Sequence, residues 1–346
     1  MMELRWIPGT DDQTWMRTVS AYPDADIYHD LTYARAAALG NEVVLVEATS
    51  GTARLALTLA LKPIPACGGY LDAESPYGYA GPLCLGDVTG LWPAVLAALA
   101  ERLVINVFLR LSPMATVSLP HGCWRSPPQM TACIPLADGL ESAFAGGRCA
   151  GHRSQVARGQ RAGLRATTRS APSMADLQRF RLLYDTTMQA LNADGSYYFS
   201  DAYYQLVTRL GDRLSAVEVV DAHDVIHAAA LFMRGAHWAH YHLSGRLQGG
   251  HNAAGDLLLH AGAAWAAENR CSLLHLGGGH SSAADDPLLA FKRRIGRADT
   301  TAAFAGIVCL PAVHARLTSA WEAAAGRQAR WFQGYREPHR GVPDGQ

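Results

Sequence analysis

The segment from residue 237 to residue 277 constrains the fold more than any other part of this sequence. It begins with HWAHYHLSG (237–245), passes through a glycine-containing loop to AAGDLLLHAGAAWAAEN (253–269), and ends in CSLLHLG (271–277). The first and last stretches have the composition and length of strands, and the middle stretch has the length of a helix. The order strand, loop, helix, strand favours an α/β fold in which helices cover a sheet.

The same alternation extends over most of the chain, which predicts two domains. A chain of 346 residues, 49% of them hydrophobic, exceeds what one hydrophobic core usually supports, and its two halves repeat a similar order of elements. We expect domains at 1–145 and 146–335 and a disordered tail at 336–346. Strands are predicted at 42–48, 53–64, 105–112, 214–222, 225–235 and 301–310, and helices at 91–103 and 174–191 and up to about residue 332.

The composition limits the classes of function. The formal net charge is zero, so a polyanion must be bound by a local patch and not by the overall field of the protein. The seven cysteines are scattered and show no CxxC spacing, which argues against a disulfide framework or a zinc knuckle. The N-terminus lacks a signal peptide's apolar core, and no run reaches the roughly 20 apolar residues that span a bilayer. We expect a monomeric cytoplasmic protein without membrane insertion.

The fourteen histidines raise the question of a metal site. His240 and His242 lie two apart on a predicted strand, hence on one face, but no third and fourth ligand of defined geometry is evident. We therefore predict no metal. His242 is either a satisfied core histidine or a polar group that accepts a proton from an incoming amine.

A basic segment joins the two predicted domains. RCAGHRSQVARGQRAGLRATTR (148–169) contains six arginines, and no acidic residue lies between Ser142 and Ala175. The segment is either a solvated helix face that forms ion pairs between domains or a surface that binds phosphate. Its candidate phosphate-binding residues are Arg148, Arg153, Arg158 and Arg161.

A second basic cluster follows the glycine triplet of LLHLGGGHSSAADDPLLAFKRRIG (273–296). Asp286 followed by Pro287 is a good N-cap and first-turn pair, so a short helix is predicted to begin there. Because this helix begins at Pro287, the triplet is predicted to be a tight loop, with a phosphate cradle as the alternative. Phe291 and Lys292 then project from the second turn. Near the helix end, three arginines either complement the helix dipole or bind a polyanion: Arg293, Arg294 and Arg297.

The succession HYHLSG, a helix ending in WAAEN, LHLGGG and DDPLLAFKRRIG closely resembles the second domain of the Fem-type peptidyltransferases. That family carries Leu-Gly-Gly-Gly, a spacer, Asp-x-Leu and Phe-Lys. QVARGQRAGLRAT and LQRFRLLYDTTMQALNADGSYYFSDAYYQLV are similar to the family's arginine-rich helix and helix-to-tyrosine segment. The resemblance covers residues 130 to 300 well and the first 125 loosely, through YGYAGPL.

The resemblance implies a fold and an activity. The fold is an α/β architecture of mixed sheets, with two tandem GNAT-like acyltransferase domains and no coiled-coil insertion, the first domain on the acceptor side and the second on the donor side. The activity is transfer of an amino acid from aminoacyl-tRNA to an amine, which forms a peptide bond without a ribosome. Aminoacyl-tRNA is then a co-substrate, and no cofactor is expected.

The resemblance also implies roles for two residues. Phe291 and Lys292 occupy the Phe-Lys position, which faces the aminoacyl end of the tRNA. An aminoacyl ester is already activated, so the enzyme must mainly align the amine and stabilise the oxyanion and the departing ribose oxygen. An ammonium group does this as a compact charge, which explains a lysine in a chain whose only other lysine is Lys62. Candidate proton acceptors are Asp285, Asp286 and His242.

Tyrosines are the candidate acceptor-binding residues, and capping of the core is their alternative role. Family members that modify cell-wall precursors often carry an arginine shortly before the paired tyrosines, where this chain has Phe199 and Ser200. We therefore expect a small-molecule or peptide amine as acceptor, in specialised metabolite (antibiotic-type) biosynthesis, with a cell-wall precursor as the alternative. The candidates are Tyr77, Tyr79, Tyr198, Tyr203 and Tyr241.

Acyl-coenzyme A is the alternative donor. In GNAT acyltransferases, whose fold the 237–277 segment also resembles, the helix N-terminus after such a strand holds the pyrophosphate of coenzyme A. The usual loop pattern, Gln/Arg-x-x-Gly-x-Gly/Ala, is not met, because RLQGGH places His251 where a small residue is needed. A catalytically idle RNA-binding or partner-binding relative is the third class, and it would tolerate Lys292→Ala.

Overall fold

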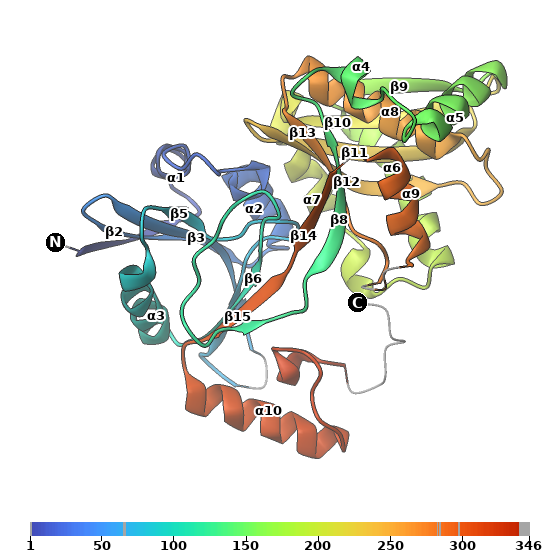
Figure 1. Ribbon diagram of the computed structural model, residues 1–346. Helices are drawn as coiled ribbons and strands as arrows, with labels where there is room; N and C mark the ends of the chain where they lie inside the picture. Colours follow the sequence, from blue (N-terminus) through green and yellow to red (C-terminus); the bar gives the residue numbers. More distant parts are fainter. Residues whose placement is uncertain (1, 65–66, 282, 284, 297, 339–346) are drawn as a thin grey trace. The chain divides into compact units, whose positions relative to one another are not determined.

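A computed structural model describes residues 2–64, 67–281, 283, 285–296 and 298–338 (Figure 1). The chain forms two compact units, the first from Met1–Gln129 and Thr301–Gln346 and the second from Met130–Thr300. Each unit is a mixed sheet covered by helices.

The first unit is built on a sheet with the strand order β1-β2-β3-β4-β6-β15-β7, and β5 pairs with β3. Its strand β3 is buried on both faces: Leu55, Leu57 and Leu59 pack with α3, whereas Ala56 and Ala60 pack with α1 and α2. A continuous apolar run is typical of such a strand. The elements are β1 (Met2–Pro8), α1 (Asp12–Val19), η1 (Ile27–His29), α2 (Leu31–Ala37), β2 (Glu42–Ser50), β3 (Ala53–Pro63), β4 (Leu71–Glu74), β5 (Leu83–Leu85), η2 (Thr89–Leu91), α3 (Trp92–Glu101), β6 (Val104–Arg110), β7 (Trp124–Arg125), β15 (Phe304–Val308), α10 (Pro311–Ala325) and η5 (Gly334–Arg336).

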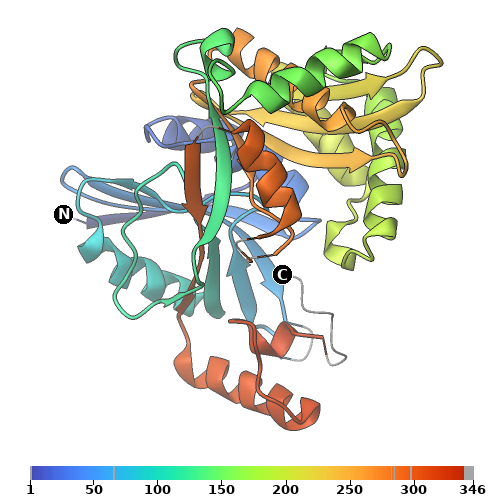
Figure 2. The ribbon, with the colours of Figure 1, turned by 45° about the vertical axis from the view of Figure 1, so that its right-hand side comes forward.

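The second unit has the strand order β14-β8-β13-β12-β11-β10-β9. Helices α5 and α8 cover one face of this sheet, and α6 and α7 cover the other (Figure 2). The elements are β8 (Gln129–Pro135), α4 (Leu140–Ala143), α5 (Ala150–Arg161), β9 (Arg165–Ser170), α6 (Met174–Ala190), η3 (Gly195–Tyr197), α7 (Asp201–Val207), η4 (Thr208–Arg213), β10 (Leu214–Val220), β11 (Ile226–Arg234), β12 (Trp238–Arg246), α8 (Ala254–Glu268), β13 (Leu273–Gly277), α9 (Pro287–Ile295) and β14 (Ala298–Ala302).

The two units share one motif, a parallel strand pair joined through a helix. In the first unit β4 and β6 are parallel and α3 connects them; in the second β12 and β13 are parallel and α8 connects them. The similar order of elements in the two halves of the sequence therefore reflects two units of the same architecture. The mixed α/β class predicted from the sequence is confirmed.

The predicted domain boundary at 145/146 is wrong, because the second unit begins at Met130 and the chain returns to the first unit at Thr301. Strand β8 pairs with β13, which places residues 130–145 in the second unit. Strand β15 follows the second unit in sequence but pairs with β6 and β7 of the first. The strand predicted at 301–310 is accordingly two strands, β14 in the second sheet and β15 in the first.

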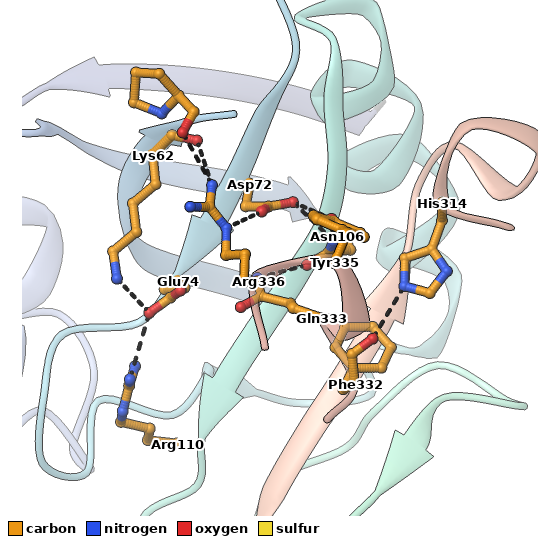
Figure 3. Close-up of polar contacts among 11 residues, drawn as sticks. Lys62, Asp72, Glu74, Asn106, Arg110, His314, Phe332, Gln333, Tyr335 and Arg336 are labelled. Carbon is orange, nitrogen blue, oxygen red and sulfur yellow. Dashed lines mark hydrogen bonds and ion pairs between the residues drawn. The ribbon is translucent and has the colours of Figure 1, made fainter. Parts of the chain in front are cut away.

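The C-terminal segment packs on the first unit (Figure 3). The carboxylate of Asp72, which is fully buried on β4, accepts hydrogen bonds from Asn106 on β6 and from Tyr335, and it forms an ion pair with Arg336. Burial raises the pKa of Asp72, and Tyr335 and Arg336 oppose that shift. The disordered tail predicted from residue 336 therefore begins too early, since Arg336 is part of this cluster; residues 339–346 lie outside the described part of the chain.

Candidate functional site

The second unit has an opening in its ladder of hydrogen bonds where β12 and β13 separate. These parallel strands pair only at Trp238↔Leu273, Ala239↔Leu274 and His240↔His275, although both continue beyond that point. The corresponding strands of the first unit stay together, since β4 and β6 pair up to Glu74↔Phe108. Ligands of open α/β sheets bind outside the carboxyl ends of strands at such points, so this is the candidate site.

A bulge in β12 places His242 at this opening. Leu231 pairs with Leu243 and Phe232 pairs with Tyr241, so His242 is the additional residue of the bulge. Its Nε2 lies 2.7 Å from the hydroxyl of Tyr203 on α7. Burial, and then the charge of His240, lower the pKa of His242 to about 3, so the imidazole is neutral and is a weak base. The predicted role of His242 as proton acceptor is therefore unfavourable.

Lys292 reaches the same opening from α9. Its side chain is buried, its Nζ donates a hydrogen bond to the carbonyl oxygen of Gly278 at 2.6 Å, and Nζ lies 5.6 Å from the ring centroid of Tyr241. Among the described residues it forms no ion pair. Burial lowers the pKa of Lys292 to about 8, and the charge of Asp286 opposes that shift. The ammonium and the neutral amine are thus both accessible near neutral pH.

The low pKa predicts an effect of Lys292→Met on stability. Between pH 8 and pH 10.5 the unfolded chain holds a proton on Lys292 that the native protein has lost, so wild-type stability rises with pH in that window. The variant should have the larger free energy of unfolding at pH 7, by up to about 3 kcal/mol, and this advantage should shrink above pH 8. Chemical unfolding at pH 7 and pH 10 measures it. A variant less stable than wild type at pH 7 would contradict the burial of a charged lysine.

The glycine triplet is a tight loop that encloses a carboxylate. Asp286 is the N-cap of α9 and accepts hydrogen bonds from the backbone amides of His280, Ser281 and Leu289. A Cβ on Gly279 would lie 2.3 Å from Asp286 Oδ1, so only glycine fits there. The loop therefore surrounds the Asp286 carboxylate, and its Gly278 carbonyl oxygen accepts the hydrogen bond from Lys292.

Asp286 and Phe291 have structural contacts. Burial raises the pKa of Asp286, but the hydrogen bonds from Leu289, Ser281 and His280 outweigh burial and the pKa is lowered, which makes this carboxylate a poor proton acceptor. The ring of Phe291 would be 3.1 Å from a Cβ on Gly255, so it packs directly on the first turn of α8. Phe291 thus fixes α9 against α8 and, with it, the position of Lys292.

The candidate acceptor-binding tyrosines are divided between the units. Two of them lie at the opening: the hydroxyl of Tyr203 contacts His242, and the ring of Tyr241 lies against Lys292 Nζ. Tyr198 is partly exposed after η3. Tyr77 and Tyr79 belong to the first unit, where the Tyr77 carbonyl accepts a hydrogen bond from Tyr33 and the Tyr79 ring contacts Tyr28. Binding of an acceptor by any of the five stays a prediction.

Three of the arginines predicted to bind tRNA have partners within the second unit. Arg153 donates to the carbonyl oxygens of Phe144 and Gly146. Arg293 forms a bidentate ion pair with Asp299 through contacts of 2.7 and 3.1 Å. Arg294 forms an ion pair with the buried carboxylate of Asp256 at 2.9 Å. Carboxylates thus neutralise Arg293 and Arg294, and the guanidinium group of Arg153 donates to backbone carbonyl oxygens. These groups are less available to a phosphate than the sequence suggested.

The remaining arginines differ. Arg158 and Arg161 are exposed in the last turn of α5 and have no ion-pair partner in the part of the chain that the structure describes. Arg148 is exposed in the loop before α5. Arg297 lies outside the described residues. Binding of phosphate at the end of α5 stays a prediction.

Many backbone amides of the loop before α8 are already hydrogen-bonded. Five amides between residues 247 and 254 donate within the loop or to His227 on β11, so these five are not available to a phosphate. The bonds run from Leu247 N to His227 O, Gly250 N to Leu247 O, His251 N to His227 Nδ1, Ala253 N to His251 Nδ1, and Ala254 N to His251 O.

An acidic side chain also occupies the start of α8. Asp256 lies in the first turn, is buried, and contacts both His152 on α5 and Arg294 on α9 at 2.9 Å. A carboxylate in a first turn takes the favourable place of an anion at the helix dipole.

Within the described residues, no group of three or more His, Cys, Asp or Glu side chains is arranged to hold a metal ion. In the same residues no helix is long and apolar enough to cross a membrane.

Comparison with known proteins identifies the fold. No protein-family model matches the sequence, and no curated protein matches it. The crystal structure of FemX superposes with a TM-score of 0.62 at 13% identity, covering 90% of this chain and 98% of FemX. The chain has the Fem-type fold. The C-terminal domain of a protein described as a lysylphosphatidylglycerol synthetase from Agrobacterium fabrum gives 0.55 at 17% identity (86% and 92% covered), and L-PGS from Bacillus licheniformis gives 0.50 at 16% (76% and 84%).

The Fem-type fold confirms the resemblance drawn from the sequence, with two GNAT-like units in tandem. Three features of the site were not predicted: the Gly278 carbonyl as partner of Lys292, the Tyr203–His242 pair, and Asp256 at the start of α8. Each joins segments far apart in the sequence. On β12, the sequence pointed to the site only through His240 and His242, which lie two residues apart on the predicted strand.

Proposed function

We propose that this protein is an acyltransferase that moves an amino acid from aminoacyl-tRNA to the amine of a small molecule or peptide. The observation that carries the proposal is Lys292, a buried lysine with a depressed pKa at the point where β12 and β13 separate. Perturbed titratable groups at such positions are typical of active sites. The similarity of the fold to that of FemX supports the proposal.

The internal hydrogen bonds of the loop before α8 favour an aminoacyl-tRNA donor over acyl-coenzyme A. A coenzyme A pyrophosphate needs free amides at a helix N-terminus, and here five loop amides donate internally and the carboxylate of Asp256 lies in the first turn of α8. An aminoacyl-tRNA presents its phosphates along an extended acceptor arm and does not depend on that helix end. Acyl-coenzyme A is the alternative donor.

An amine other than a cell-wall precursor is the acceptor that the α7 region favours. Where an arginine often precedes the paired tyrosines in cell-wall enzymes, Phe199 is buried with its ring 4.3 Å from Tyr203, and Ser200 caps α7. Neither side chain offers a cation to a nucleotide diphosphate. We infer a role in specialised metabolite synthesis, with the cell-wall precursor as the alternative acceptor.

The tRNA proposal predicts a change in salt dependence. Replacing Arg158 and Arg161 with alanine should weaken tRNA binding and reduce the slope of log affinity against log salt by about 1 to 2, because each lost phosphate contact removes about 0.9 from that slope. Filter-binding assays at about 50 to 300 mM salt measure this slope.

The Arg17→Ala variant is the control for the loss of one exposed positive charge elsewhere, because Arg17 is exposed on α1 of the first unit. It should leave the slope unchanged. An unchanged slope in the Arg158 and Arg161 variant would remove the end of α5 from the tRNA surface.

A further inference from the structure

Asp256, in the first turn of α8, is a buried carboxylate that connects three helices of the second unit. Its Oδ1 lies 2.9 Å from Nδ1 of His152 on α5, and its Oδ2 accepts a hydrogen bond of 2.9 Å from Arg294 on α9. Asp256 is 1% exposed, and His152 is fully buried. One carboxylate therefore links α8 to both α5 and α9.

The three helices are in close contact around this carboxylate. A Cβ on Gly159 of α5 would lie 2.3 Å from Leu257 of α8, so these two helices pack directly against each other. A Cβ on Gly151, in the first turn of α5, would lie 3.9 Å from Nη1 of Arg294. The side chain of Arg294 therefore lies where α5, α8 and α9 meet, and Asp256 neutralises its charge there.

The contact between Asp256 and Arg294 bears on the position of Lys292, which lies two residues before Arg294 on α9. Because Asp256 is buried, losing its arginine would leave a charge in the interior, and such a loss is costly. The second ion pair of the helix, Arg293 with Asp299, has side chains that are 45% and 38% exposed, and exposed pairs contribute little. The pair with Asp256 is therefore the stronger of these two contacts.

We propose that Asp256 is a positioning residue for aminoacyl transfer. It holds α9, and with it Lys292, in place relative to the exposed arginines at the end of α5, because both helices bind the same carboxylate through Arg294 and His152. The inference rests on the proposed function and adds a residue that acts through Lys292 and not on the substrate. A displacement of reacting groups by about 1 Å can lower a rate by about 100-fold.

The first test is Asp256→Ala, which removes the shared acceptor and leaves Lys292 and the exposed arginines of α5 unchanged. Single-turnover transfer at saturating tRNA should fall on the order of 100-fold, because Lys292 is no longer held in position. The affinity for tRNA in filter binding should stay within about threefold of wild type. A rate within about threefold of wild type in the folded variant would overturn the inference.

Glu218→Ala is the matched control for a mere loss of stability. Glu218 is also a carboxylate of the second unit with 1% exposure and an ion pair to an arginine, but its partners, Arg169 and Arg179, lie on β9 and α6. Its thermal unfolding should also come at a lower temperature, because a buried ion pair loses one member. Its transfer rate should stay within about threefold of wild type. A rate loss equal to that of Asp256→Ala would overturn the inference.

Arg294→Met breaks the same contact from the side of α9 and serves if Asp256→Ala does not fold, since the Arg294 side chain is 38% exposed. It should show the same loss of rate at saturating tRNA. Where both single variants fold, the double variant should be no slower than the slower of them by more than about threefold, because both changes remove one contact. Losses that multiply would overturn the inference, since they would show independent effects.

The position of Lys292 can also be measured without substrate. The chain has only two lysines, Lys62 and Lys292, so protein labelled with ¹³C at lysine Cε gives two resonances, assigned with Lys62→Arg. The double variant of Asp256 and Arg294 keeps the net charge, so a shift of the Lys292 resonance in it reports a change of position. The Lys62 resonance, from the first unit, should not move. An unchanged Lys292 resonance would overturn the inference.

These measurements distinguish the inference from the proposed function. A shifted Lys292 resonance in a protein that transfers no aminoacyl group would contradict the proposed function alone. Active transfer by the wild-type protein, with an undiminished rate in folded Asp256→Ala, would overturn the role of Asp256 alone.

Discussion

Replacing Lys292 with alanine should lower the single-turnover rate of aminoacyl transfer by about 100-fold to 10,000-fold, the usual contribution of a positioned acid or base. The affinity for tRNA should change little, because the Lys292 side chain is buried and its Nζ donates to the Gly278 carbonyl inside the second unit. Rates at saturating tRNA, compared with binding constants from filter assays, separate the two effects.

Two results would contradict this prediction. An equal loss of rate and of tRNA affinity would assign Lys292 to binding alone. Full activity in the alanine variant would show that Lys292 takes no part in the chemistry. The thermal unfolding of the variant, measured in parallel, shows that its fold is intact.

Replacing Asp72 with alanine should destabilise the first unit by about 3 to 5 kcal/mol. Removing one member of a buried ion pair leaves its partner uncompensated, and here Arg336, Tyr335 and Asn106 would all lose their acceptor (Figure 3). Chemical unfolding should show an earlier transition for the variant. Because the second unit has its own core, part of the signal should persist at the wild-type midpoint.

Asp12→Ala is the matched control for this prediction. Asp12 also pairs with an arginine, Arg35, but its side chain is 72% exposed, and exposed ion pairs contribute at most about 1 kcal/mol. If Asp72→Ala were no more harmful than Asp12→Ala, the C-terminal segment would not be part of the first unit's fold.

Local signals predicted the elements around the site well. The helix predicted at 253–269 spans Ala254–Glu268, and Asp286 followed by Pro287 marked the start of α9. These predictions succeeded because caps, proline positions and apolar periodicity act within one or two turns of chain. The tight loop at the glycine triplet followed from the same local argument, and the contact between Gly279 and Asp286 explains it.

Long-range pairing was not predictable in the same way. Strand β8 pairs with β13 of the second unit, and β15 pairs with β6 of the first. No local sequence pattern encodes which strand each of them pairs with. For the same reason, the arginines were visible as a cluster but their acidic partners were not. Arg294 pairs with Asp256, which lies 38 positions away in the sequence.

Single-turnover deacylation tests the central claim most directly. A pool of radiolabelled aminoacyl-tRNAs is mixed with excess protein and with amine acceptors from a cell extract, beside the Lys292→Ala variant, and the loss of label from each tRNA is followed. The account predicts that one tRNA species loses its label to an amine with the wild-type protein only. No acceleration for any tRNA, together with release of free thiol from acyl-coenzyme A, would contradict it.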